Sequence, residues 1–248
     1  EIDVEDKYSI LGRCFGHSSF RGGQEALIDG ILAGRDVLGV MPTGGGKSIC
    51  YQLPALLLPG LTMVISPLIS LMKDQVAALE EAGIPAAFVN SSMTSEEFRT
   101  ACGAVRSGEC RILYVAPERL ENEGFVAMVG SREVSLIAVD EAHCVSQWGQ
   151  DFRPSYLRVA GFVDSLPSRP VVAAFTATAT EGVREDITQG LALRDPLQMV
   201  TGFDRPNLHF SVRSPKTKEK LPLLLSLLEE RRDKSGIVYC ATRAKVEQ

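Results

Sequence analysis

Two adjacent carboxylates, Asp140 and Glu141, follow an apolar run at residues 136–139 and are well suited to chemistry. Such a run is typical of a buried parallel strand, and ligand sites of open α/β sheets lie at the carboxyl ends of their strands. One carboxylate can hold a metal ion while its neighbour orients or deprotonates an attacking water, as phosphoryl transfer to water requires. A solvent-facing acidic pair would give the same pattern, so this motif alone leaves both interpretations open.

A glycine-rich segment upstream favours the first interpretation. Residues 37–41 predict another buried strand, residues 42–48 have the sequence PTGGGKS, and a helical pattern follows. Successive glycines let backbone N–H groups turn toward phosphate oxygens without a Cβ clash. The lysine would then reach the β and γ phosphates, and the serine hydroxyl would face Mg²⁺ at the helix N-terminus. The two motifs together predict a site for a nucleoside triphosphate and Mg²⁺, with loop residues Thr43, Gly44, Gly45, Gly46, Lys47 and Ser48.

The composition predicts an intracellular enzyme. The chain has 248 residues, 45% of them hydrophobic, which is enough for one large domain and part of another. No apolar run approaches the roughly 18 residues of a membrane span. No signal-peptide pattern opens the chain, and its six cysteines include no C-x-x-C pair. We therefore expect reduced thiols, no membrane partner, a monomer, and a cytoplasmic location, with the bacterial cytoplasm or nucleoid favoured.

The charge distribution gives only weak information about partners. The net charge is −5, so the chain as a whole lacks the basic footprint of a simple nucleic-acid binder. Residues 1–204 carry 16 basic and 26 acidic side chains, whereas residues 205–248 carry 10 basic and 5 acidic ones. A basic segment is usually a solvated surface, so individual basic positions matter more than the total.

Strand and helix patterns alternate through most of the chain. This alternation predicts a doubly wound parallel sheet with helices on both faces and with the motifs at its carboxyl edge. Thr94 and Glu97 form a capping-box pattern for a helix that runs through Ala104. The expected strands are 37–41, 62–66, 86–89, 111–116, 136–140 and 171–175.

A boundary is expected where the alternation stops. We assign residues 1–201 to a first lobe and residues 202–215, which contain two prolines and little helical periodicity, to a linker. Residues 216–248 would begin a second α/β lobe, with a helix at 221–232, a buried strand at 236–242 and the start of another helix. These residues are too few to close a sheet, and the chain starts without Met, so we expect a piece of a longer protein.

Seven motifs carry a resemblance to RecQ-type DNA helicases of superfamily 2, and together they cover nearly the whole chain. The resemblance implies RecA-like lobes, ATP hydrolysis, 3′ to 5′ translocation on single-stranded DNA and duplex unwinding in recombination and repair. Met41 replaces the first glycine of the strict phosphate-loop pattern, as in the PTGxGK variant of this superfamily. The motifs occur in the family's order: MPTGGGKS (41–48), SPLISLMKDQ (66–75), YVAPERL (114–120), DEAH (140–143), SQWGQDFRP (146–154), FTATAT (175–180) and IVYCATRAKVEQ (237–248).

The resemblance also assigns roles around the nucleotide. Asp140 would order Mg²⁺, Glu141 would activate water, and His143 would couple the site to its neighbours. The segment FGHSSFRGGQ (15–24) is similar to the family's nucleotide-reading motif. There His17 would stack on the base, Arg21 would lie alongside the nucleotide, and Gln24 would hydrogen-bond the adenine edge. The family usually has Tyr at position 17 and Pro at position 22, where this chain has His and Gly.

The aromatic segment after DEAH resembles a loop that senses DNA. Aromatic faces stack on unpaired bases with little sequence preference. The alternative is a loop that Trp and Phe anchor against the lobe, and the resemblance favours the DNA-sensing role. Gln150 stands where many relatives have His. The residues expected to contact DNA or to couple it to hydrolysis are Ser66, Lys73, Gln147, Trp148, Phe152, Arg153, Thr176 and Thr178.

The resemblance places the transition-state arginine in the later part of the second lobe. We therefore expect these 248 residues to bind nucleotide, to hydrolyse ATP poorly and not to unwind DNA. An RNA helicase or an ATP-driven remodeller would share the phosphate loop and DEAH. A non-enzymatic ATP-binding adaptor would not need both Lys47 and Glu141. Zinc-binding, winged-helix and tail domains, and the preferred DNA structure, stay open.

Overall fold

The computed structural model describes residues 6–149, 151–202 and 208–242. The chain divides into two compact units, Glu1–Phe203 and Asp204–Gln248. This division lies close to the expected end of the first lobe at residue 201, while the assignment of domains stays a prediction.

The first unit is built on a parallel sheet that, within the described residues, has seven strands in the order β3-β4-β2-β5-β6-β1-β7. Six of them match the expected strands to within two residues at each end. The seventh, Leu197–Val200, was not predicted, because it is short, lies at the sheet edge and is only partly buried. The strands are β1 (Val37–Val40), β2 (Leu61–Ile65), β3 (Ala86–Val89), β4 (Ile112–Val115), β5 (Val134–Val139), β6 (Val171–Thr176) and β7 (Leu197–Val200).

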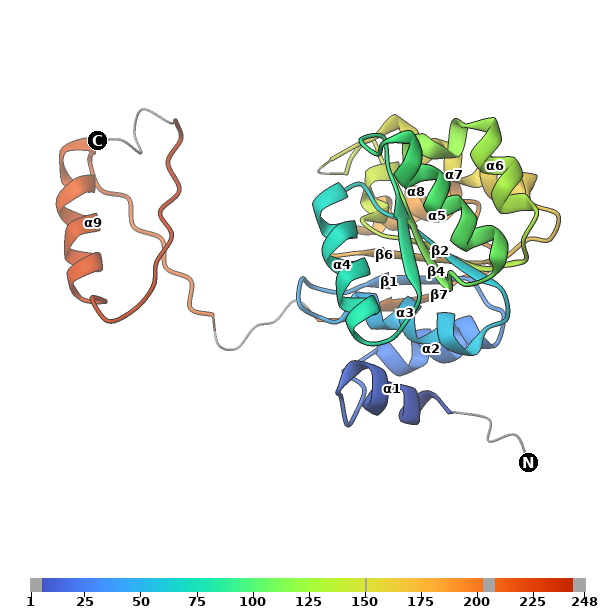
Figure 1. Cartoon of the computed structure of the whole chain (residues 1–248). Coiled ribbons are helices and arrows are strands. Elements are labelled where there is room, and N and C mark those ends of the chain that lie inside the picture. Colours follow the sequence, from blue (N-terminus) through green and yellow to red (C-terminus); the bar gives the residue numbers. More distant parts are fainter. Residues whose placement is uncertain (1–5, 150, 203–207, 243–248) are drawn as a thin grey trace. The chain divides into compact units, whose positions relative to one another are not determined.

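Helices cover both faces of this sheet, as predicted (Figure 1). One face carries α1 (Lys7–Phe15), α2 (Gln24–Leu32), α3 (Lys47–Leu57) and α4 (Ile69–Glu81). The other face carries α5 (Ser95–Ser107), α6 (Glu123–Gly130), α7 (Arg158–Ser165) and α8 (Glu181–Gly190). The predicted capping box of α5 is confirmed, since Thr94 and Glu97 exchange both hydrogen bonds. No described helix is long and apolar enough to cross a membrane.

The two faces bury alternate residues of the same strands. In β5, Ile137 and Val139 pack in the core on the α5–α8 side, whereas Leu136 and Ala138 pack in the core on the α2–α4 side. Because both faces are covered, the strands are continuously apolar. Polar side chains are therefore concentrated where strands end.

The amino-terminal edge of the sheet is fixed by a buried ion pair. The Asp36 carboxylate accepts two hydrogen bonds from the Arg169 guanidinium, at 2.7 and 3.1 Å, and two more from the backbone N–H groups of Val172 and Arg194. Charge-assisted bidentate pairs of this kind set geometry tightly. The register of β1, β6 and the segment before β7 is thus set at the amino-terminal ends of the strands, opposite the ends that carry the motifs.

The second unit contains a short 3-10 turn, η4 (Thr217–Glu219), and helix α9 (Lys220–Glu229). The helix predicted at 221–232 is confirmed, although it ends three residues earlier. The strand predicted at 236–242 is wrong, because these residues form no strand and Ile237 and Tyr239 are 80% and 91% exposed. A strand needs backbone partners, and the described residues of this unit include no second strand. The helix predicted after residue 242 lies outside the described residues.

Candidate functional site

The phosphate loop joins β1 to α3 at the carboxyl edge of the sheet. Gly44 and Gly46 adopt positive φ angles of 78° and 79°, and a Cβ on Gly45 would lie 2.8 Å from the carbonyl oxygen of Pro42. Side chains are therefore disfavoured at all three glycines. The N-cap of α3, Gly46, offers no side-chain acceptor to the first N–H groups of the helix. An anion such as phosphate can satisfy donors of this kind.

Lys47 is the first residue of α3, and its amine lies back across the loop. Its Nζ donates a hydrogen bond of 3.2 Å to the carbonyl oxygen of Met41. The Met41 side chain is buried, with its sulfur 3.9 Å from Cys50 Sγ. Methionine at the position of the missing glycine therefore fills the core, while its carbonyl faces the loop.

Arg21 and Gln24 hold the same loop from the N-terminal side. Gln24 Nε2 donates to the carbonyl oxygens of Gly46 at 3.1 Å and Gly45 at 3.4 Å, and its Oε1 accepts from the Arg21 N–H at 2.7 Å. Arg21 Nη1 donates to the Gly44 carbonyl at 2.8 Å. These hydrogen bonds clamp the loop, and Gln24 is only 2% exposed. The hydrogen bond of Gln24 to adenine stays a prediction. His17 is exposed on the same N-terminal segment.

Asp140 directly follows β5, and its carboxylate is almost completely buried. Its N–H donates to Ile65 O, which continues the sheet, and its Oδ1 accepts from the N–H of Glu141 at 3.0 Å. Burial and, to a lesser degree, the Glu141 charge raise the pKa of Asp140 to about 6, against the opposing effects of the Glu141 N–H hydrogen bond and the Lys47 charge. Asp140 is thus a buried acid within electrostatic reach of the phosphate-loop lysine.

Glu141 and His143 begin a chain of polar contacts toward β6. His143 Nδ1 lies 3.3 Å from Glu141 Oε2 and 2.9 Å from Thr176 Oγ1, and Thr176 Oγ1 donates to Thr178 O at 3.1 Å. Because the Thr176 hydrogen is directed at Thr178, its oxygen accepts from His143 Nδ1. The His143 contact lowers the pKa of Glu141. The Cys144 sulfur and the Glu141 carboxylate raise the pKa of His143.

The aromatic loop after DEAH carries an exposed indole. Trp148 is 87% exposed and Gln147 is exposed, whereas Phe152 is half-buried. A Cβ on Gly149 would lie 2.3 Å from the carbonyl oxygen of His143, so the tight turn beneath the indole requires glycine. A hollow of about 450 Å³ lies beside the loop, lined by Val145, Gln147, Trp148, Phe152, Leu157, Asp186, Gln189 and Gly190. Gln150 lies outside the described residues.

Arg153 contacts other groups of the site. Its N–H donates to Cys144 O at 2.9 Å, its Nη1 donates to Pro67 O at 3.2 Å, and its Nε and Nη2 donate to Asp151. The Arg153 side chain thus ties the loop to the segment after β2, and its role toward DNA stays a prediction.

The remaining expected DNA residues differ in exposure. Lys73 and Thr178 are exposed, whereas Thr176 is buried. Ser66 is 2% exposed, and its hydroxyl has no hydrogen-bond partner among the described residues, so its contact with a strand backbone stays a prediction. Its N–H donates to Val115 O and continues β2, which keeps the residue inside the sheet.

Three residues to which the sequence assigned no role also belong to this site. Tyr156 donates its hydroxyl to Asp140 O at 2.9 Å, and Ser146 Oγ donates to Asp186 Oδ2 at 2.5 Å. Ser146 Oγ also accepts from the Trp148 N–H at 3.2 Å. In the sequence these residues look like an ordinary core aromatic and two surface polar groups. Only the structure, which places them beside the DEAH segment and the aromatic loop, identifies them.

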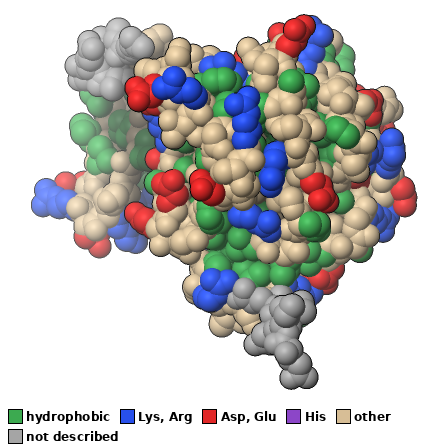
Figure 2. All heavy atoms as spheres, turned by 45° about the vertical axis from the view of Figure 1, so that its right-hand side comes forward, with side chains coloured by type: hydrophobic (Ala, Val, Ile, Leu, Met, Phe, Trp, Pro, Cys, Tyr) green, Lys and Arg blue, Asp and Glu red, His purple; other side chains and the backbone are tan. Residues whose placement is uncertain are grey.

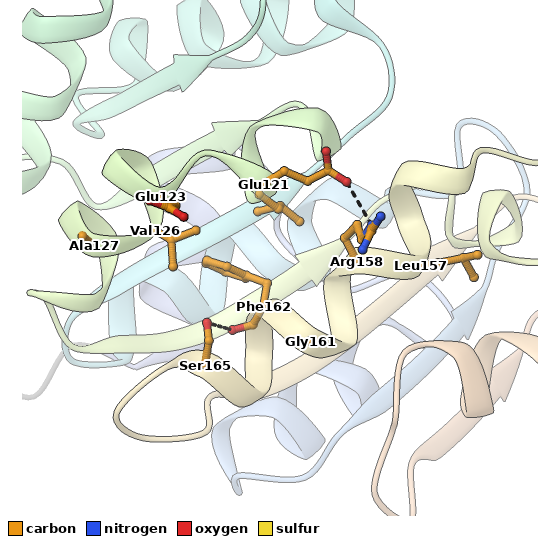
Figure 3. Close-up of a pocket in the computed structure, with 10 residues that line it drawn as sticks. Glu121, Glu123, Val126, Ala127, Leu157, Arg158, Gly161, Phe162 and Ser165 are labelled. Atoms are coloured by element: carbon orange, nitrogen blue, oxygen red, sulfur yellow. Dashed lines mark hydrogen bonds and ion pairs between the residues drawn. The ribbon is translucent and has the colours of Figure 1, made fainter.

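One large hollow of the first unit is lined by none of the predicted site residues. It measures about 760 Å³ and lies between η1 (Pro117–Glu121), α6 and α7, with Phe162 and Val126 on its walls and a Glu121–Arg158 ion pair at 2.9 Å (Figure 3). Basic and acidic side chains are interspersed on the face that Figure 2 shows, in keeping with the acidic net charge of residues 1–204. Chemistry therefore concentrates at the sheet edge and not in this hollow.

The fold, the loop and the DEAH geometry agree with comparisons to known proteins. A family model described as DEAD/DEAH box helicase matches residues 21–186, more than half of the chain. The chain belongs to the DEAD/DEAH box helicase family. Curated relatives named "ATP-dependent DNA helicase RecQ" are 45% identical over 100% of the chain in Haemophilus influenzae and 44% identical over 97% in Bacillus subtilis. The resemblance to the RecQ type of superfamily 2 is thereby confirmed.

The chain spans about two fifths of the length of these relatives, 39% and 40%. Among solved structures, the DUF1998 helicase MrfA bound to DNA and AMPPNP matches all of this chain with a TM-score of 0.73 at 19% identity, using 37% of its own chain. The Pyrococcus furiosus Hef helicase domain matches 71% of this chain and 37% of its own, with a TM-score of 0.56 at 21% identity. These likenesses confirm the RecA-like helicase fold.

Burial of Asp140 predicts a pH-dependent effect on stability. A raised carboxyl pKa means that the folded state binds a proton more tightly, so stability falls as pH rises from about 4 to about 6. The substitution Asp140→Asn removes the free-energy cost of burying a charged carboxylate. The asparagine side-chain oxygen can still accept a hydrogen bond from the Glu141 N–H. We expect the variant to be more stable than the parent by about 3 kcal/mol at pH 8 and nearly equal to it at pH 4.

Urea denaturation at pH 4, 5, 6 and 8 measures this difference. Asp164→Asn is the control, because Asp164 is exposed on α7 and the variant should track the parent at every pH. A parent that is at least as stable as Asp140→Asn at pH 8 contradicts the account.

Proposed function

We propose that the protein is an ATP-dependent DNA helicase that translocates 3′ to 5′ on single-stranded DNA and unwinds duplexes in recombination and repair. The observation that carries the proposal is a glycine-formed phosphate loop whose lysine lies within electrostatic reach of the buried Asp140, while the Asp140 carbonyl accepts a hydrogen bond from Tyr156, directly after the exposed tryptophan loop. The names of the relatives support DNA as the substrate. The proposal includes residues 1–201 as the first helicase lobe, 202–215 as linker and 216–248 as the start of the second lobe.

The residues of the loop fit a magnesium nucleotide. The described residues contain no cluster of three or more His, Cys, Asp or Glu that would form a metal site by itself. Mg²⁺ would instead take oxygen from Asp140, Ser48 and the phosphates, which is the usual arrangement for this ion. When bound, Mg²⁺ would neutralise phosphate charge. Lys47, now bonded to the Met41 carbonyl, would add a positive charge beside the same phosphates.

The environment of Glu141 suits a group that orients and deprotonates water. Its pKa is lowered by His143, so it is ionised at neutral pH, whereas the neighbouring Asp140 has a raised pKa. Two adjacent carboxylates with opposite shifts can take different roles. We therefore assign metal holding to Asp140 and water activation to Glu141, with His143 holding the Glu141 carboxylate in place.

The exposed side chains near the loop supply the proposed DNA contacts. Trp148 would stack on an unpaired base, and Gln147, Lys73 and Thr178 offer polar or charged groups to the strand. Thr176 is buried, so it would act indirectly, through its hydrogen bond with His143. We further propose that the protein acts as a monomer. We place it in the bacterial cytoplasm or nucleoid, because the two relatives named above are from bacteria.

Glu141→Gln tests the hydrolytic role in the complete protein. The amide cannot accept the proton of water, so we expect the kcat of DNA-stimulated ATP hydrolysis to fall at least about 100-fold with little change in the KM for ATP. Glu123→Gln, at an exposed glutamate on α6, should behave like the parent. Single-stranded DNA should stimulate the parent more than single-stranded RNA. Full activity of Glu141→Gln would contradict the enzymatic role, and stronger stimulation by RNA would contradict the substrate.

Trp148→Ala tests the DNA contact. Loss of one base stack, worth about 1 to 3 kcal/mol, should weaken binding of a labelled single-stranded oligonucleotide by roughly 5- to 150-fold, measured by fluorescence anisotropy. Trp148→Phe keeps an aromatic face and should retain most of the affinity. If alanine binds as tightly as tryptophan, the exposed indole is not a DNA contact.

A further inference from the structure

The peptide between Asp140 and Glu141 is held in an unusual conformation. Glu141 has φ 48° and ψ 44°, a left-handed conformation that non-glycine residues rarely adopt. Such a conformation persists only where surrounding contacts impose it. The direction of the Glu141 carboxylate therefore depends on whatever fixes this peptide.

Two hydrogen bonds hold the peptide, one on each side. Its N–H, from Glu141, donates to Asp140 Oδ1 at 3.0 Å. Its carbonyl oxygen, from Asp140, accepts from the Tyr156 hydroxyl at 2.9 Å. The first bond is local and belongs to the metal-holding side chain itself. The second comes from a residue sixteen positions later in the chain.

Tyr156 is rigidly joined to the aromatic loop. It is completely buried in η3 (Pro154–Leu157), directly after the loop, and its N–H donates to Arg153 O at 3.0 Å. Arg153 in turn donates its own N–H to Cys144 O and its Nη1 to Pro67 O. A displacement of the loop at Trp148 or Phe152 is therefore passed to the phenol, which has no room to move independently.

We propose that Tyr156 is a positioning residue that transmits DNA contact at the aromatic loop to the Glu141 carboxylate through the Asp140 carbonyl. This inference rests on the proposed helicase function and deepens it. Tyr156 contacts neither nucleotide-loop residues nor the exposed face of Trp148 by any hydrogen bond that the structure shows. Its loss should therefore change turnover and leave binding unaltered.

Tyr156→Phe in the complete protein tests this role, because it removes the hydroxyl and keeps the ring. Tyr114→Phe is the matched control. It removes another buried phenol hydroxyl, one that accepts from Gln52 Nε2 at 2.8 Å and forms no hydrogen bond to the DEAH segment within the described residues. ATPase rates are measured without DNA and across a titration of single-stranded DNA, together with melting temperatures.

We expect kcat at saturating DNA to fall roughly tenfold in Tyr156→Phe, the factor expected for one misoriented hydrogen bond. The KM for ATP and the half-saturating DNA concentration should stay within twofold of the parent, and Tyr114→Phe should keep the parental kcat. Unchanged kcat in Tyr156→Phe overturns the proposal. An equal loss of kcat in both variants also overturns it. The same holds for a loss that a weakened affinity for ATP or DNA explains, and for a Tyr156→Phe protein that no longer folds. A parent that DNA fails to stimulate would instead refute the proposed function.

Discussion

The buried carboxylate of Asp140 is the constraint on which the site depends. It stands at the end of a central strand, where water is nearly excluded and its pKa rises to about 6. A free carboxylate is unfavourable there, and a divalent ion together with Lys47 would reverse that preference. The sheet supplies the rigidity for this arrangement, since β5 is hydrogen-bonded on both sides and Asp140 itself bonds to Ile65.

The other functional groups are placed relative to this acid by backbone contacts as much as by side chains. The phosphate loop is held by the clamp of Arg21 and Gln24, and Glu141 is turned toward His143 by a left-handed backbone. From His143 one path runs to Thr176 on β6, and from the Asp140 carbonyl another runs to Tyr156 below the aromatic loop. The DEAH segment, β6 and the segment after the aromatic loop are thus joined by hydrogen bonds at the ends of the strands.

Much of this architecture could be predicted from sequence, because it depends on local patterns. Apolar runs that end in polar residues predicted six of the strands, and the glycines of PTGGGKS predicted the phosphate loop. Other features depend on tertiary contacts. The amide of Gln24 faces the loop it helps to fold, Ser66 is kept inside the sheet, and Tyr156 could not be distinguished from any core aromatic. The apolar segment 236–242 lacks a pairing partner among the described residues, so its sequence preference did not produce a strand.

The central claim is that DNA contact at Trp148 and water activation at Glu141 belong to one path through Tyr156. The most direct measurement is a double-mutant cycle of Trp148→Ala and Tyr156→Phe in the complete protein, using kcat at saturating single-stranded DNA. If the two residues act on one path, the double variant should be no slower than the slower single variant. If the two losses multiply, the residues act independently and the account is contradicted.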